Sequence, residues 1–432
     1  IGRIQVQLPA TVLVEKVYVE DLQKDTLLYG GRLQAGINLF RLIRNEIKVN
    51  EVHLENITAH VNRKLPDTVF NFQFIIDAFA SGNEQTATTD TAAMKMEVKR
   101  ILLDDIRVSF YDTITGSDMA LTLDHFDTRI DHFDPNTMQF AIQSIRGNGI
   151  AARVYQNKPL IEPVAAPDTA ATTLPQLFLR NLDLENIEID YRNDVDALFA
   201  LVRFNNLETR MRAMDMAAMR VALDKVVLDG LDTRIIMGKN ASVNTPPQKK
   251  LPDTAAATAS WNITVNDFRL TKSFVQFDDE NQPRLRYGMD YAHLDAGDLS
   301  LHLSDLFFDG DTISASVRNA SVKERSGLLL EQLQGDFLYT PTGASVENLL
   351  IKTPGTRIQH TIKVSYPSLE AAQKQPELVK MQVVLPDSRI QNKDVLLFAP
   401  MLRDQPLLAN PNNVIRINAK VSGSLKRIIA EE

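Results

Sequence analysis

The feature that most constrains the fold of this chain is a period-two alternation of apolar and polar residues along its length. Such alternation is typical of β-strands that bury one face and expose the other. Turn-forming residues separate the runs, as at Gly30-Gly31, Thr115-Gly116-Ser117 and Asp309-Gly310-Asp311. The clearest runs are residues 4–8, 33–39, 119–123, 138–142, 299–303 and 414–421. The sequence therefore predicts an all-β fold.

Helical periodicity is confined to short segments. Residues 39–44, 72–79, 368–378 and 393–402 place apolar residues closer to a spacing of 3.6. Pro400 should end or kink the last of these helices, because proline lacks the amide donor that an α-helix needs. All four segments are too short to form a helical layer, so we expect only a few short helices.

A degenerate internal repeat accompanies the alternation. Its template reads apolar, acidic, polar, apolar, any, apolar, any, and then aromatic or Val. Copies begin at Leu54, Leu103 and Leu184, with a weaker copy at Leu270 and an opening variant at Val14. Template positions four, six and eight share one strand face, whereas position one has the opposite parity. The acidic and polar residues at positions two and three suit a bulge or turn where the strand changes face.

Three segments rich in Ala, Thr, Pro and Asp interrupt the pattern. They are residues 81–93, 159–173 and 239–259, and their few large apolar residues predict mobile loops between strands. The same alternation resumes beyond each segment. We therefore predict one continuous repetitive β architecture over residues 1–432 rather than separate domains.

Composition excludes several classes of function. The chain has 47 Lys and Arg against 55 Asp and Glu, a net charge of −8, and no dense basic stripe. Nucleic acid is therefore not expected as a partner, because binding its phosphate backbone requires a concentration of positive charge. Cysteine is absent, which excludes disulfides, thiol nucleophiles and cysteine–zinc sites. No apolar run approaches the ~18 residues of a membrane-spanning helix. Because the chain opens at Ile1 without a signal-peptide core, we expect a targeting segment to precede it.

No cluster of residues indicates catalysis. The cluster most like a metal site is residues 124–134, but a strand would divide its candidate ligands between two faces, with His125, Asp127 and Asp131 on one and His132 and Asp134 on the other. The sequence contains neither a phosphate-cradling glycine loop nor a Gly-x-Ser-x-Gly elbow. We expect no enzyme activity, no metal site and no cofactor.

The apolar face of the predicted sheet is the informative feature, because it has to be covered. It could close on itself as a sandwich or solenoid with a dry core. It could instead curl into an open trough of aliphatic side chains, against which acyl chains pack without polar anchors. The candidate lining residues are Val17, Val19, Ile37, Val49, Ile57, Val108, Phe110, Ile187 and Ile189.

Two series of segments point to a family. The first comprises residues 17–21 (Val-Tyr-Val-Glu-Asp), 23–30, 33–42, 47–49, 54–57 and 69–76, and the second comprises residues 393–400, 410–412 (Asn-Pro-Asn) and 420–424. Together they resemble the N-terminal region of the TamB-like translocation and assembly module proteins, within the wider AsmA-like superfamily. The resemblance covers most of the chain and is strongest over residues 1–80 and 380–425.

The resemblance implies an elongated, curled β-sheet with an apolar groove, a shape called a β-taco. It also implies an inner-membrane anchor preceding Ile1, with the remainder in the periplasm of a Gram-negative bacterium. Members of the family are implicated in carrying phospholipid between the inner and outer membranes and in outer-membrane biogenesis. An outer-membrane Omp85-type barrel is an implied partner, although it would dock on a C-terminal domain that has no counterpart in this sequence.

Two other functions remain open. One is a scaffold for outer-membrane protein translocation or assembly that carries no lipid and pairs its edge strands with client proteins. The other is a surface β-solenoid, either an adhesin or a polysaccharide-active enzyme. Solenoids of that kind usually have equal repeats, whereas the template here recurs at unequal intervals. The resemblance therefore favours the lipid groove, with phospholipid acyl chains as its ligands.

Overall fold

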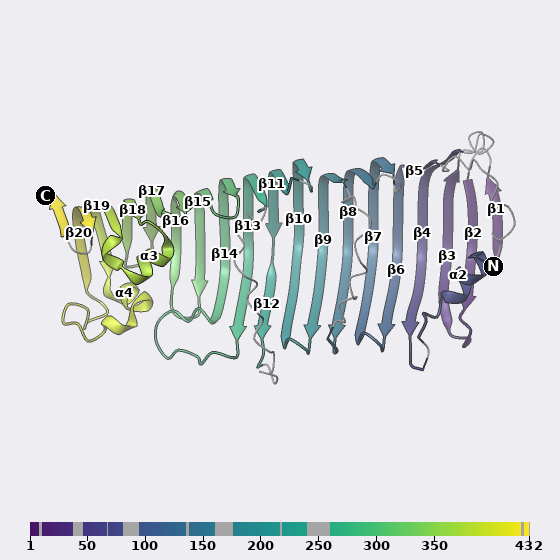
Figure 1. The fold of residues 1–432 in the computed structure, drawn as a ribbon, viewed down its shortest axis with the longest axis horizontal. Helices are drawn as coiled ribbons and strands as arrows, with labels where there is room; N and C mark the ends of the chain where they lie inside the picture. The colour runs from purple at the N-terminus through teal and green to yellow at the C-terminus, as the bar shows by residue number, and fades with distance from the viewer. Residues whose placement is uncertain are drawn as a thin grey trace. The chain divides into compact units, whose positions relative to one another are not determined.

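A computed structural model confirms the all-β prediction (Figure 1). It describes residues 1–7, 11–37, 46–66, 68–80, 95–134, 138–159, 176–216, 218–239, 260–424 and 427–431. About 70% of these residues lie in strands, which form a mixed parallel and antiparallel sheet. The helices are few and short. The chain divides into two compact units, which are described separately below.

Unit 1 consists of Ile1–Leu207, Met214–Ala217 and Met237–Asn240. Its strands are β1 (Arg3–Gln7), β2 (Thr11–Glu20), β3 (Thr26–Ile37), β4 (Glu46–Arg63), β5 (Lys95–Val98), β6 (Arg100–Asp112), β7 (Ser117–Asp134), β8 (Gln139–Gln156), β9 (Gln176–Asn193) and the first part of β10 (Leu198–Asp215). Neighbours from β1 to β4 and from β6 to β8 pair antiparallel. The pairs β4–β5, β4–β6 and β8–β9 are parallel, and a long connection precedes β5 and β9 as parallel pairing requires.

Unit 2 consists of Glu208–Ala213, Ala218–Ile236 and Ala241–Glu432. After β11 (Arg220–Asp229) and β12 (Asp232–Met237), its strands are β13 (Asn262–Asp279), β14 (His293–Phe308), β15 (Ile313–Glu324), β16 (Leu329–Thr340), β17 (Gly343–Lys352), β18 (Arg357–Ser365), β19 (Lys380–Gln391), β20 (Val414–Ser424) and β21 (Arg427–Glu431). β11 pairs parallel with β13, and from β13 to β21 each strand pairs antiparallel with the next. Unit 2 is thus mostly a long antiparallel meander.

At template positions two and three, where a bulge or turn is predicted, the backbone is irregular in every copy of the repeat. Lys16, Asn56, Asp105, Asn186 and Lys272 all have positive φ, between 49° and 54°. Asn and Asp tolerate this left-handed conformation better than other residues with a Cβ, which explains their preference at the position. In unit 1 the ladder omits these residues from strand to strand, so the bulges line up as one bend across β2, β4, β6 and β9.

The helix predictions are confirmed where the structure describes the residues. The segment predicted over 72–79 is α2 (Gln73–Ala80). The segment at 368–378 forms α3 (Leu369–Lys374) and the short 3₁₀ helix η1 (Pro376–Leu378). As expected, helix α4 (Asn392–Phe398) stops before Pro400, where the 3₁₀ helix η2 (Pro400–Leu402) begins. The predicted helix at 39–44 and nearly all of the three predicted loops lie outside the described residues.

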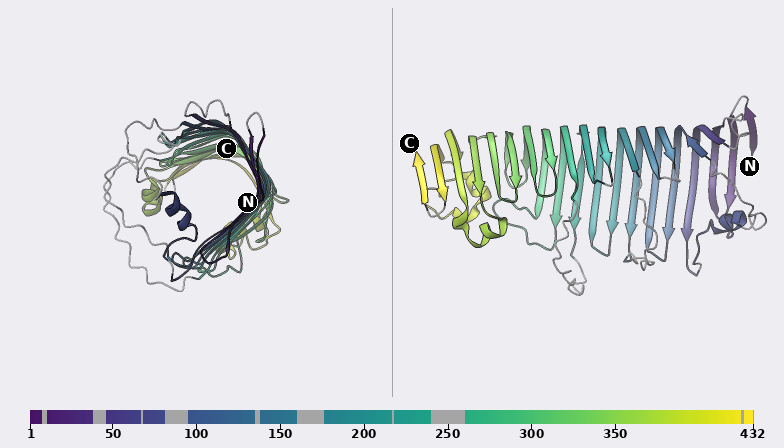
Figure 2. Two further views of the ribbon diagram at one scale, coloured as in Figure 1. Left: turned by 90° about the vertical axis from the view of Figure 1, so that its right-hand side faces the viewer. Right: turned by 45° about the horizontal axis from the view of Figure 1, so that its top comes forward.

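The sheet of each unit is curved, and the short helices of that unit lie on its concave side (Figure 2). In unit 1 this helix is α2, drawn in dark blue, and in unit 2 the helices are yellow-green. The ring of Phe70, just before α2, lies 5.7 Å from the ring of Phe110 on β6. The face of the sheet that carries Phe110 is therefore the concave one.

Candidate functional site

The concave face of unit 1 is apolar in row after row of the sheet. We call the following residues the apolar face of unit 1. Four rows follow from the strand register: Val14–Leu33–Leu54–Leu103–Phe126–Gly147–Leu184, Val17–Gly30–Ile57–Ile106–Leu123–Ile150–Ile187, Val19–Leu28–Ala59–Val108–Leu121–Ala152–Ile189 and Val61–Phe110–Met119–Val154–Tyr191. Not one of these positions carries a charge, so the face offers a continuous hydrocarbon surface.

The bend across the strands divides this face into a dry interior and an accessible part. Inside the bend, Ile57, Ile106 and Leu123 are buried against each other. Their neighbours from both sides of the bend pack on this cluster: Leu28, Leu33, Leu54, Leu103, Val108, Phe126 and Ile150. Because rows on either side of the bulge contact the same cluster, the bulge joins them into one apolar surface.

Away from the bend, the apolar face is open to solvent. Leu121, Met119 and Ile189 expose 37%, 38% and 39% of their surface, respectively. Large apolar side chains that gather on one face and stay this exposed mark a surface for an apolar ligand or partner. The ring of Phe70 covers part of the fourth row, at Phe110.

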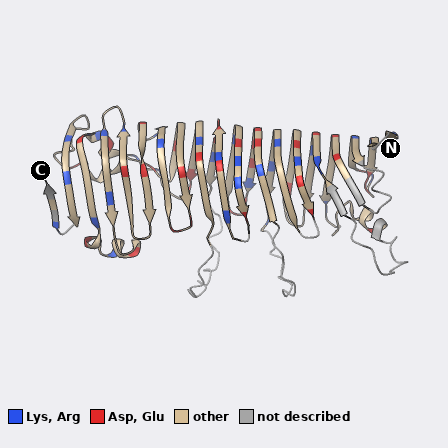
Figure 3. Ribbon diagram, turned by 90° about the horizontal axis from the view of Figure 1, so that it is seen from above, with Lys and Arg blue, Asp and Glu red and all other residues tan. Residues whose placement is uncertain are grey.

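The opposite face of the same strands is polar. The row beside the bend reads Glu15–Arg32–Glu55–Asp104–His125–Asn148–Glu185. Charged residues of both signs are interspersed along the strands, as Figure 3 shows. The carboxylate of Asp104 joins two histidine rings, His53 Nε2 at 2.7 Å and His125 Nδ1 at 2.6 Å. Desolvation pushes the pKa of Asp104 upward, but the hydrogen bonds with both rings outweigh it and lower the pKa below its ordinary value.

A second ion pair on the polar face involves Asp127. The guanidinium of Arg100 donates to both of its carboxylate oxygens, at 2.9 and 3.1 Å, and also reaches Glu51 at 3.2 Å. The Arg100 contact holds the pKa of Asp127 below its ordinary value. This face is therefore suited to water and counter-charges, and not to hydrocarbon.

A row of polar side chains, buried except for the half-buried Arg63, ends the apolar face at the turns after β6, β8 and β9. We call this row the polar margin: Arg63, Asp112, Ser117, Gln156 and Asn193. Arg63 donates to both oxygens of Asp112, and the Ser117 hydroxyl donates to Gln156 Oε1 at 2.7 Å. The Arg63 guanidinium lowers the pKa of Asp112 well below its usual range. The margin sets a sharp boundary between hydrocarbon and charge.

The residues predicted to line a groove fall on the apolar face where the register places them. This holds for Val17, Val19, Ile57, Val108, Phe110, Ile187 and Ile189. Val49 is buried on β4 opposite Ile37, whose side chain lies outside the described residues. Val49, Ile57 and Ile187 are buried, with 6–8% of their surface exposed. Contact of the predicted residues with lipid stays a prediction.

The sequence-based prediction did not name several residues that pair with the predicted ones across the sheet. Ile106, Leu121, Leu123 and Ile150 complete the rows across β6, β7 and β8. Leu121 and Leu123 stand in an alternating run, so their face was readable once a partner strand was known. The register that aligns this run with β6 was not readable, because it depends on the bulges in both strands.

The metal-like cluster of residues 124–134 is drawn into ion pairs. His125 contacts Asp104 and Asp127 contacts Arg100, in the pairs already described. Among the described residues, no group of three His, Asp or Glu side chains is arranged to hold a metal ion.

Unit 2 has an apolar face built in the same way. Two of its rows are Ala315–Phe337–Val346–Ile362–Val383–Val421 and Ile313–Tyr339–Ala344–Val364–Met381–Gly423. Between them, on the other face, runs the row Ser314–Leu338–Ser345–Lys363–Gln382–Ser422. The period-two pattern thus produces one apolar face in each unit.

Comparisons with known proteins add no identity. No protein-family model matches the chain, and a search of curated proteins finds no relative. Within the described part of the chain, no helix combines the length and apolar character that crossing a membrane would require.

Proposed function

We propose that this chain is a lipid carrier whose apolar faces hold phospholipid acyl chains while the headgroups remain in water. The observation that supports the proposal most strongly is the uncharged concave face of unit 1, which stays partly exposed at Leu121, Met119 and Ile189. A protein whose apolar face closed into an ordinary hydrophobic core would bury these residues. An alkyl chain laid on this face would remove hydrocarbon from water at about 0.8 kcal/mol per buried methylene.

The uniformity of the face favours movement along the sheet. Successive strands present aliphatic residues at the same level, as Val108, Leu121, Ala152 and Ile189 do on β6 to β9. An acyl chain that shifts from one strand to the next therefore exchanges similar dispersion contacts. No charged side chain interrupts the row to create a barrier or a trap. This is the behaviour expected of a carrier surface and not of a single binding site.

The physiological setting in this proposal comes from the family resemblance. A TamB-like protein would be anchored in the inner membrane and would extend through the periplasm of a Gram-negative bacterium. The chain would then carry phospholipid between the inner and outer membranes and so support outer-membrane biogenesis. The role is non-enzymatic and needs no cofactor, and an Omp85-type barrel is a further candidate partner.

Leu121 and Thr122 offer a matched pair of variants for the test. They are neighbours on β7, both are exposed, and their side chains lie on opposite faces of the sheet. Leu121→Asp places a charge in the middle of the apolar face, whereas Thr122→Asp places the same charge on the polar face. A carboxylate among acyl chains would lose its hydration, so only the first change should oppose lipid binding.

The measurement is lipid mass spectrometry on the gently purified full chain and on both variants. We expect co-purifying phospholipid in the wild type and in Thr122→Asp, and at least a fivefold loss in Leu121→Asp. Circular dichroism and thermal unfolding show whether each variant is folded. A folded, lipid-free wild type would reject the carrier proposal and favour the assembly scaffold. Equal lipid in both variants would show that the apolar face of unit 1 does not bind it.

A further inference from the structure

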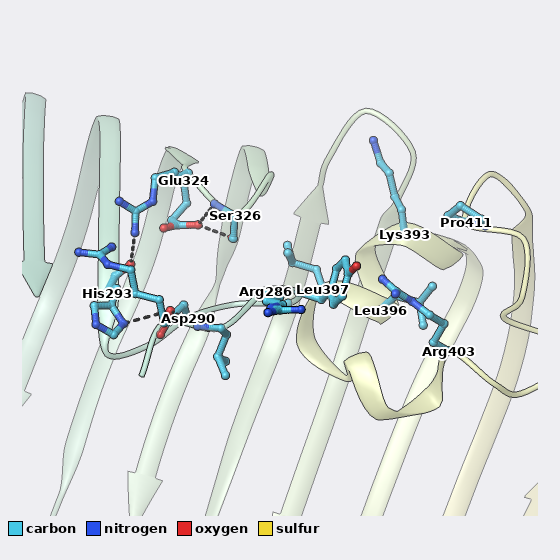
Figure 4. A pocket seen from close by; sticks show the side chains of 15 residues that line it. Arg286, Asp290, His293, Glu324, Ser326, Lys393, Leu396, Leu397, Arg403 and Pro411 are labelled. Carbon is cyan, nitrogen blue, oxygen red and sulfur yellow. Dashed lines mark hydrogen bonds and ion pairs between the residues drawn. The ribbon is translucent and has the colours of Figure 1, made fainter. Parts of the chain in front are cut away.

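A pocket of about 550 Å³ lies in unit 2, between the β13–β14 connection and helix α4 (Figure 4). Five of its lining residues are cations: Arg284, Arg286, Arg325, Lys393 and Arg403. Only two are acids, Asp290 and Glu324. The pocket therefore carries an excess of positive charge in a chain whose net charge is −8.

The β13–β14 connection is held firmly against α4. The amide of Met289 donates to the carbonyl of Leu397 at 2.7 Å. Gly288 has φ of +87°, and a Cβ there would stand 2.9 Å from Pro400 Cγ and 3.1 Å from the Leu397 carbonyl oxygen. Glycine is thus required for this close approach, which shapes one wall of the pocket.

Both acids of the pocket are already satisfied by the chain. Asp290 accepts from the Leu285 amide at 2.8 Å and contacts Nδ1 of His293 at 3.0 Å. Glu324 accepts from the amide and hydroxyl of Ser326 and from the Asp295 amide. These carboxylates are therefore engaged by donors other than the pocket cations.

The cations differ in how far they are engaged. Arg284 pairs with Asp278 at 2.6 Å, Arg325 donates to the His293 carbonyl at 3.1 Å, and Arg403 stacks 4.1 Å from the centre of the Tyr287 ring. Arg286 and Lys393 have no acid within ion-pair distance among the described residues. Figure 4 shows Arg286 between the His293–Asp290 pair and Leu397.

We propose that this pocket binds the phosphate group of a phosphate ester, with Arg286 as its main ligand. A guanidinium presents a planar fork of donors that matches two phosphate oxygens, and the neighbouring cations strengthen the attraction. Leu285, Leu396 and Leu397 line the same pocket and would pack against the carbon atoms next to the phosphate. The shared chemistry fits both a phospholipid headgroup and a soluble phosphate ester. The inference does not depend on acyl binding to the apolar face of unit 1.

The test is a calorimetric titration of the full chain with three probes. They are glycerol 3-phosphate, monomeric dihexanoylphosphatidylglycerol, and dihexanoylglycerol as the uncharged control. Saturable binding of the first two, without binding of the third, supports a general phosphate-ester site. Binding of the short-chain phospholipid alone supports a headgroup site. The proposal is overturned if neither phosphate probe binds, or if dihexanoylglycerol binds as well as the phospholipid does.

Variants assign the binding to the pocket. Arg286→Gln and Lys393→Gln remove charges that make no ion pair in the described structure, so both should fold. Arg416→Gln removes an exposed arginine on β20 that does not line the pocket. We expect affinity for the phosphate probe to fall about tenfold in Arg286→Gln, about threefold in Lys393→Gln, and not at all in Arg416→Gln. Equal losses of affinity in all three variants would show that the binding depends only on the net charge of the protein, and the proposed site would be rejected.

The outcomes remain separable from those of the carrier proposal. Leu121→Asp changes unit 1 and should leave the titration with glycerol 3-phosphate unchanged. Arg286→Gln changes unit 2 and should not remove the co-purifying lipid that Leu121→Asp is expected to remove. Loss of one readout without the other therefore identifies which proposal has failed.

Discussion

Leu103 lies on the same face of β6 as Ile106 and packs against the buried cluster that contains Ile106, although the two are three residues apart in an extended strand. Two residues separated by an odd number of positions normally lie on opposite faces. The reversal occurs at Asp105, which has a φ of 52° and is left out of the ladder opposite Asn56. The same geometry joins Leu54 to Ile57 across Asn56. The apolar face is continuous because of these bulges.

The left-handed conformation of Asp105 predicts that its variants differ in stability. Asp105→Val should lower the free energy of unfolding by about 1–2 kcal/mol, because a β-branched side chain clashes with the backbone at positive φ. Asp105→Asn should be nearly neutral, since Asn occupies the equivalent positions 56 and 186. Urea unfolding followed by circular dichroism would measure both. Equal stability of the Val and Asn variants would show that the bulge is not required.

Burial divides two neighbours on β9 that sequence alone treats alike. Ile187 is 6% exposed inside the bend, whereas Ile189 is 39% exposed on the same face. Ile187→Asp should destabilise unit 1 by on the order of 3 kcal/mol or more, because the buried carboxylate has no partner. Ile189→Asp should change stability by less than about 1 kcal/mol.

Lipid mass spectrometry then separates folding from binding in these two variants. Loss of lipid from a folded Ile189→Asp protein would reflect the surface itself, whereas loss from Ile187→Asp would follow from unfolding. If Ile187→Asp were as stable as the wild type, the bend would be more open than the structure shows.

The polar margin predicts a pH dependence of stability. The pKa of Asp112 is lowered in the folded state by Arg63, so its contribution is full above the unfolded carboxyl pKa of about 3.9. That contribution is lost as the pH falls below about 4, because the unfolded state then binds a proton more readily. Asp112→Asn should therefore cost about 1–3 kcal/mol at pH 7. The difference from wild type should narrow at acidic pH.

Chemical unfolding of both proteins at pH 7 and pH 3 provides this comparison. Asp190→Asn, which changes an exposed aspartate on the polar face, should leave the midpoint at pH 7 unchanged. A difference for Asp112→Asn that is the same at both pH values would contradict the role given to its charge.

Asn392 predicts a local effect in unit 2. Its side chain is fully buried, and its amide group donates to the carbonyl oxygens of Leu407 and Asn410 at 2.8 and 2.9 Å. Asn392→Ala would remove the donor to the Leu407 carbonyl and leave the Asn410 carbonyl with the Asn413 amide at 3.2 Å, at about 1–3 kcal/mol for a buried group left unpaired. We expect faster amide hydrogen exchange over residues 403–413, measured by mass spectrometry. Asn412→Ala, an exposed change in the same loop, should leave the exchange nearly unaltered.

Local chemistry alone made several features of this protein predictable. Alternation predicted strands, Pro400 predicted the end of α4, and the acidic and polar residues at positions two and three predicted bulges that the structure contains. Each of these properties depends on a residue and its close neighbours in the chain. Residues such as Val108 and Phe110 could be assigned to one face for the same reason, since the parity of a strand is a local property.

The sequence by itself determined the strands, the bulges and the side of each strand that is apolar. Only the tertiary structure decided how the strands align. This alignment buries Ile187 while Ile189 stays exposed, and it brings the rings of His53 and His125 to the carboxylate of Asp104. The tertiary structure also gathered Arg286, Arg325 and Arg403 around one pocket from distant parts of the chain. These outcomes depend on register and on long-range packing, and a strand's pattern of apolar residues is compatible with more than one partner until its neighbours are in place.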